Sequence, residues 1–195
     1  MEEHSLRSNY FFTVIKLILF LFILCFLVKL TARLWGELRS QDAFNLDILV
    51  LSIISTFAFY TFISDLDGFY KKIQNFFFRA QYVSLFSPSL LVILSIGYFF
   101  VPKITNTSIN KDIFIFVGGF SFCMHLIFIA RQIKGSSFSS SVNYLFMFSI
   151  LFILNLIILS LYLRIGFNIY TGKVILEGMK NGAILIQDVF TQALR

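Results

Sequence analysis

Charged residues are scarce in this chain. Of its 195 residues, 13% are charged and 58% are hydrophobic, whereas ordinary soluble domains carry roughly 25% charged residues. Only ten residues are acidic, and none of them lies in the centre of a long apolar run. Ion-coupled transporters and proton relays typically place an acid at membrane depth. The composition therefore disfavours a soluble fold, and the missing acids count against that class of transporter.

Cysteine and histidine are equally sparse. The two cysteines, Cys25 and Cys123, lie in separate apolar runs, and neither belongs to a pair at metal-ligand spacing. No nucleotide-binding, metalloprotease or nucleophile-elbow motif is present. The sequence predicts no metal site, no cofactor and no catalytic residue.

The net charge of +6 does not indicate nucleic acid. The 16 Lys and Arg residues are scattered through short loops and helix ends, so they form no basic helix face. We interpret them as topology signals and as contacts with anionic lipid.

Long apolar runs dominate what is there. A membrane-spanning helix needs about 20 mostly apolar residues, and five segments approach or reach this length: residues 10–30, 48–64, 80–101, 113–130 and 142–163. The second is short, and it either spans or forms a buried, partly interfacial helix. Pro88 predicts a kink in the third, and Pro102 is expected to end it.

Two further segments differ from the apolar runs. Residues 66–79 place aromatic side chains beside lysines, which suits an interfacial position. From Lys173 to Arg195, apolar residues recur at helical spacing and charged residues fall on the other face. We expect this amphipathic tail to lie on the membrane or to dock on a partner, with four candidate docking residues: Gly178, Gly182, Met179 and Ile186.

The predicted fold class is therefore all-α. Residues 1–168 are expected to form a multi-pass transmembrane bundle of about five spans, and residues 169–195 to form the amphipathic C-terminal helix. Barrel strands would alternate apolar and polar residues, and these runs do not.

A few polar residues interrupt the apolar runs. His125 is the only histidine within them, and a lone imidazole at this depth can bond a neighbouring helix, titrate or contribute to a metal site. The candidate polar positions within the membrane are His125, Ser121, Asn155, Ser84 and Ser87. Interhelical hydrogen bonding is the preferred interpretation, and a path for protons or small solutes is the alternative.

The most enzyme-like fragment is Asp65-Leu66-Asp67-Gly68. Two carboxylates two residues apart could hold Mg²⁺ against a phosphate, but no further acid follows before Asp112. A solvated turn is the simpler interpretation.

Three functional hypotheses follow. The first is a non-catalytic integral membrane subunit or scaffold, whose partners are the lipid bilayer and other membrane subunits or a second copy of itself. The second is a small channel or transporter component with a polar path near His125. The third is a lipid-modifying enzyme that uses Asp65 and Asp67.

Overall fold

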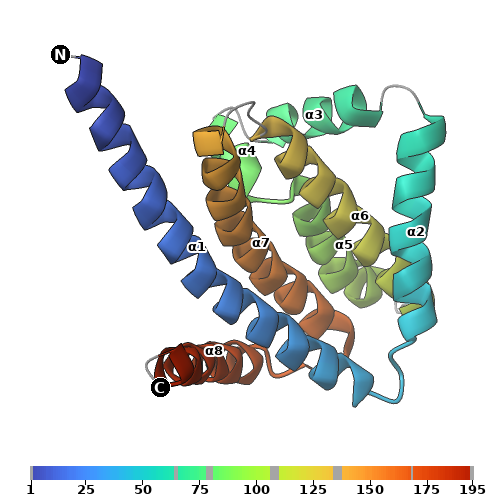
Figure 1. The fold of residues 1–195 in the computed structure, drawn as a ribbon. Coiled ribbons are helices and arrows are strands. Elements are labelled where there is room, and N and C mark those ends of the chain that lie inside the picture. The colour runs from blue at the N-terminus through green and yellow to red at the C-terminus, as the bar shows by residue number, and fades with distance from the viewer. Residues whose placement is uncertain are drawn as a thin grey trace.

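The computed structural model describes residues 2–63, 66–77, 81–105, 110–133, 138–167 and 169–193. Every regular element in these ranges is an α-helix, which confirms the predicted fold class. The described chain has eight helices (Figure 1): α1 (Glu2–Arg39), α2 (Leu46–Phe62), α3 (Leu66–Phe77), α4 (Gln81–Phe86), α5 (Ser89–Thr105), α6 (Lys111–Gln132), α7 (Phe138–Phe167) and α8 (Thr171–Ala193).

Three helices are long and apolar enough to cross a membrane. They are the parts of α1, α6 and α7 that run over Tyr10–Arg39, Lys111–Gln132 and Ser140–Phe167. The helices α2 and α5 are apolar but shorter, with 17 residues each. The chain is thus a membrane protein by the length and composition of three helices.

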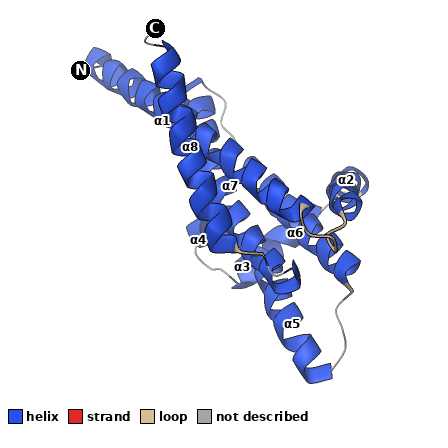
Figure 2. Cartoon of the chain, turned by 90° about the horizontal axis from the view of Figure 1, so that it is seen from below, coloured by secondary structure: helices blue, strands red, loops and turns tan. Residues whose placement is uncertain are grey.

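The long helices lie roughly along one direction of the structure, and two helices lie across its ends. The helix α3 crosses one end of the bundle and α8 crosses the opposite end (Figure 1). The turned view shows α8 along its length, beside α1 and α7 (Figure 2). Each crossing helix therefore caps a different end of the bundle.

The two prolines act differently from the prediction. At Pro88 the helix is interrupted rather than kinked, because α4 ends at Phe86 and α5 begins at Ser89. The expectation that Pro102 ends the helix was wrong, since α5 continues through it to Thr105. Close to a helix C-terminus the missing N–H of proline removes only one bond, and one more turn still forms.

Helix α2 has an inside-out distribution of polarity. In α2 the buried residues are Ser52 and Thr56, while Ile54, Phe57 and Phe62 are exposed. Soluble proteins bury their large apolar side chains, whereas membrane helices pack through small and weakly polar residues. The outer surface of α2 is therefore suited to lipid.

Glycine allows this close packing. A Cβ atom on Gly119 of α6 would lie 2.1 Å from Ser52 Oγ and 2.9 Å from Leu49 Cδ1 of α2. A Cβ atom on Gly118 would lie 2.2 Å from Tyr162 Cε1 of α7. The pair Gly118-Gly119 thus lets α6 approach α2 on one side and α7 on the other.

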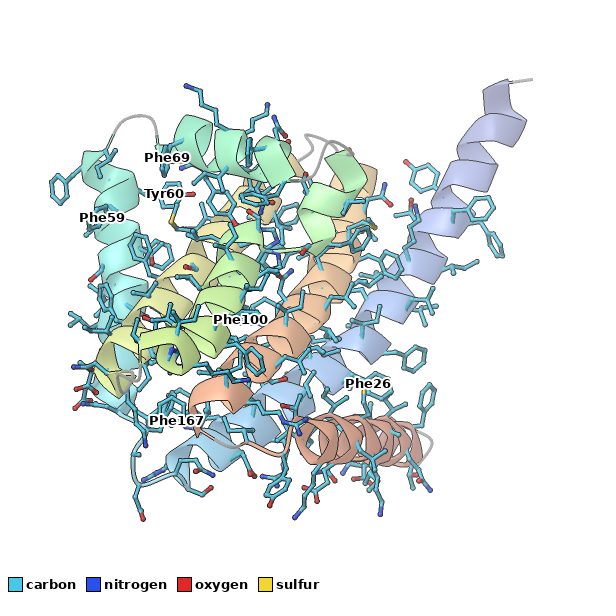
Figure 3. All side chains as sticks on the ribbon, turned by 180° about the vertical axis from the view of Figure 1, so that it is seen from behind. Phe26, Phe59, Tyr60, Phe69, Phe100 and Phe167 are labelled. Atoms are coloured by element: carbon cyan, nitrogen blue, oxygen red, sulfur yellow. The ribbon has the colours of Figure 1, made fainter. Side chains whose placement is uncertain are left out.

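Two groups of buried side chains form the core. The larger lies towards the α8 end, where the Phe114 and Tyr162 rings stack with centroids 4.1 Å apart and Tyr162 Oη donates to the Phe114 carbonyl at 2.8 Å. The smaller lies under α3 and contains Tyr70, Met124 and Phe128. In Figure 3, Tyr60 of α2 lies below α3, where it packs against this smaller group.

Candidate functional site

The interruption between α4 and α5 breaks the regular pattern of backbone hydrogen bonds. Pro88 has no N–H, so it cannot donate to the Ser84 carbonyl one turn before it. Chain outside regular helix at membrane depth is tolerated only where protein buries it or where it lines a cavity. The side chains that surround Ser87 and Pro88 therefore have to supply hydrogen bonds to this part of the backbone.

A buried cluster of Tyr70, Gln74 and His125 lies beside this interruption. All three side chains are fully buried. Tyr70 Oη lies 2.9 Å from His125 Nδ1, and Gln74 Nε2 donates to Tyr70 Oη at 2.9 Å. Gln74 Nε2 also donates to the Ser87 carbonyl at 3.3 Å. The cluster thus joins α3 to α6 and satisfies one carbonyl of the interruption.

Hydrogen-bond partners constrain the protons of the cluster. Burial raises the pKa of the Tyr70 phenol above its usual value, so the hydroxyl keeps its proton. Tyr70 Oη and Gln74 Nε2 both lie within hydrogen-bond distance of His125 Nδ1, at 2.9 Å and 3.0 Å. When Nδ1 accepts from either of them, the hydrogen of the neutral imidazole is on Nε2.

Two polar atoms of the cluster have no partner within hydrogen-bonding geometry in the described structure. They are His125 Nε2 and Gln74 Oε1, one a donor and the other an acceptor. Unpaired buried groups are costly, and a buried water commonly fills such positions. These two atoms are the chemically open part of the cluster.

The other predicted polar positions are dispersed. Ser121 Oγ donates to the Val117 carbonyl of its own helix at 2.7 Å, and Asn155 Nδ2 donates to the Leu151 carbonyl at 2.8 Å. Ser84 is buried in α4, while Ser87 enters the cluster through its backbone carbonyl. Of the five predicted positions, the structure brings His125 and Ser87 together through Gln74.

The sequence reasoning missed Tyr70 and Gln74. It treated residues 66–79 as a surface segment, and α3 indeed lies across an end of the bundle. The available signal was their spacing, because residues four apart share one face of a helix. A tyrosine and a glutamine on a face that also carries leucine and isoleucine indicate a buried polar contact.

At the other end, Gly178 and Gly182 face α1. A Cβ atom on Gly178 would lie 2.9 Å from Leu30 Cα, and one on Gly182 would lie 2.5 Å from Phe26 Cδ1. Figure 3 shows Phe26 where α1 passes over α8. Arg33 Nε also binds Glu177 Oε2 at 2.5 Å. Small residues and an ion pair therefore hold α8 against the C-terminal half of α1.

The remaining two candidate docking residues differ in their surroundings. Met179 is exposed, and Ile186 lines an apolar groove between the two helices with six other side chains: Ile18, Leu21, Phe22, Cys25, Val189 and Phe190. Docking of a partner at these residues stays a prediction.

Neither metal chemistry nor the predicted carboxylate pair gains support. The described residues contain no group of three or more His, Cys, Asp or Glu side chains that could hold a metal ion. Asp65 lies outside the described residues, and the side chain of Asp67 is also outside them. An enzyme that uses Asp65 and Asp67 stays a prediction.

No protein-family model, curated protein or solved structure matches the chain. The function of the protein is therefore inferred from its residues and from their arrangement.

Proposed function

We propose that the chain is a non-catalytic subunit or scaffold of a larger membrane complex, embedded as a five-span bundle. The spans are α1, α2, the interrupted pair α4–α5, α6 and α7, with α8 as the amphipathic C-terminal helix across one end. Successive spans run in opposite directions, and α3 and α8 lie across opposite ends, which supports this topology. With 17 residues, α2 rises about 25 Å, close to the roughly 30 Å of a bilayer core.

One observation carries the proposed role, and it concerns the N-terminal half of α1. This half stands clear of the bundle (Figure 1). Between Tyr10 and Leu24 it exposes apolar side chains in nearly every direction, and Thr13 is its one buried residue. Lys16 crosses to the bundle, where its Nζ donates to Asn143 Oδ1 at 2.6 Å.

A helix that serves only the stability of its own bundle packs along its length, because close packing drives helix association in lipid. Here α1 packs against α8 from Ile18 onward, and Arg33 adds an ion pair. The segment before Ile18 is left as an apolar arm that suits a transmembrane partner.

The test is recovery of the partner after mild detergent extraction from the native membrane. We expect the wild-type chain to co-purify with a partner at fixed stoichiometry, as measured by mass spectrometry. The triple variant Phe11→Ala/Val14→Ala/Ile15→Ala removes one exposed face of the arm and is expected to reduce the recovered partner at least about tenfold, since each exposed face residue buries apolar area on binding.

The matched control is Val50→Ala/Ile54→Ala/Phe57→Ala, which removes an equally exposed face of α2. This variant should keep the partner. Purification of the wild-type chain alone, or equal loss in the two triple variants, would contradict the proposed role of the arm.

A second function is favoured by the open atoms of the cluster. Interrupted helices form the substrate and ion sites of many transporters, and His125 Nε2 and Gln74 Oε1 are unpaired among the described residues. A channel or transporter component would pass a proton or a small polar solute at this point.

In proteoliposomes that contain an entrapped pH dye, this alternative predicts proton flux that falls at least about tenfold in His125→Gln, because the titrating imidazole is lost. Asn155→Leu also changes the flux if the path extends to α7. Circular dichroism establishes that each variant remains folded. An absence of flux for protons and for small neutral solutes rejects this function.

A further inference from the structure

The buried cluster fixes which way α3 faces. Tyr70 and Gln74 point into the bundle and bond to His125. Residues that follow them by one or two positions are rotated by 100° to 200° on a helix of 3.6 residues per turn. Lys71, Lys72 and Asn75 are accordingly exposed.

Apolar side chains occupy the flank of α3 beside these lysines. Phe69 is 58% exposed and Phe76 is 82% exposed. They are seven residues apart, so they lie on the same side of the helix two turns from each other. An exposed pair of phenylalanines next to an exposed pair of lysines is typical of a helix that lies in a membrane interface.

Lys71 and Lys72 are exposed at this end of the bundle. The described residues offer no acidic side chain within ion-pair distance of either lysine. At the α8 end, Arg33 is paired with Glu37 and Glu177.

We propose that α3 is a surface anchor that binds the phosphate groups of anionic phospholipids through Lys71 and Lys72, while Phe69 and Phe76 enter the acyl layer. The occupant is lipid because exposed lysines, which attract phosphate groups, and exposed phenylalanines, which suit the acyl layer, share one helix at the end of the bundle. The inference rests on the proposed placement in a membrane, and it does not depend on a protein partner.

The experiment places a single tryptophan on α3 of the purified full chain, as Trp35→Phe/Phe76→Trp. The protein is reconstituted in mixed vesicles of phosphatidylcholine and phosphatidylglycerol, with bromine on the acyl chains of one lipid at a time. Bromine quenches a tryptophan that it touches. From the quenching by each brominated lipid, we expect phosphatidylglycerol to bind beside the tryptophan about fivefold or more tightly than phosphatidylcholine does. Each lysine near anionic lipid contributes about that factor.

Two variants on this background isolate the lysines. Lys71→Gln/Lys72→Gln should bring the preference to about one, as should high salt, which screens exposed charges. Lys173→Gln/Lys180→Gln removes two exposed lysines of α8 instead, and it should leave the preference unchanged.

The wild-type chain, whose only tryptophan is Trp35 on α1, separates the two ways in which the inference can fail. Equal quenching by the two lipids with both lysines present overturns the anchor. Quenching of Trp35 without quenching of the tryptophan at position 76 also overturns it and leaves the membrane placement standing. If neither position is quenched, the membrane placement fails and the anchor fails with it.

Discussion

Replacing Gly119 by leucine should lower the free energy of unfolding by about 3 kcal/mol, because it forces α2 away from α6. Even a methyl group at this position would lie 2.1 Å from Ser52 Oγ and 2.9 Å from Leu49 Cδ1. Ser52 and Thr56 are the buried residues of α2, so a leucine side chain has no room between the two helices. Unfolding in mixed micelles titrated with SDS and followed by circular dichroism measures the change.

The control for this substitution is Gly97→Leu in α5, where a Cβ atom would meet nothing within 4 Å. This variant should change the free energy of unfolding by less than about 1 kcal/mol, as is usual for surface substitutions away from special features. A compensating pair adds a second comparison, because Ser52→Ala removes the atom that Gly119→Ala would strike. The double variant should be more stable than Gly119→Ala alone, and equal losses for Gly119→Leu and Gly97→Leu would show that α2 does not pack as described.

Removing the Gln74 amide is expected to have the next largest effect. Gln74→Leu leaves the Ser87 carbonyl and the Tyr70 hydroxyl without their donor in a fully buried place. A buried polar group that loses its partner costs about 1 to 3 kcal/mol, so we expect a loss of about 2 to 3 kcal/mol in the free energy of unfolding. The same SDS titration measures it.

Three comparisons make this expectation specific. Tyr70→Phe keeps the ring and removes one hydroxyl, so it should cost about 1 kcal/mol, in the range of single interhelical bonds in membranes. Gln74→Leu combined with Tyr70→Phe should cost less than the sum, because the two side chains share one network. Asn75→Leu, on the exposed side of α3, should be nearly neutral. If Gln74→Leu costs no more than Asn75→Leu, the cluster does not hold α3 to the bundle.

The interruption and the cluster form one structural unit. Pro88 removes a backbone donor, and Gln74 brings a side-chain donor to the neighbouring Ser87 carbonyl. The same glutamine also fixes the orientation of α3, so that Lys71 and Lys72 face outward. A change at His125 or Gln74 is therefore expected to alter both the packing of the bundle and the orientation of the proposed lipid anchor.

The all-helical class and the positions of the long apolar helices could be predicted from the sequence alone. Runs of about 20 apolar residues require helices in lipid, since each helix satisfies its own backbone groups, and α1, α6 and α7 cover the predicted ranges. The segment at residues 66–79 was expected only to lie at the interface, and its described part, Leu66–Phe77, is a helix. These features are local, because periodicity and composition over one segment decide them.

Only the tertiary structure decided which residues meet. His125 was singled out as a lone polar residue, but its partners Tyr70 and Gln74 come from a helix about 50 residues earlier in the chain. The contact of Gly178 and Gly182 with α1 is likewise decided by tertiary packing, since Leu30 and Phe26 are about 150 residues away in the chain. Spacing within one segment carries no information about contacts between distant segments, and packing of the whole bundle selects among the many pairings that each helix face allows.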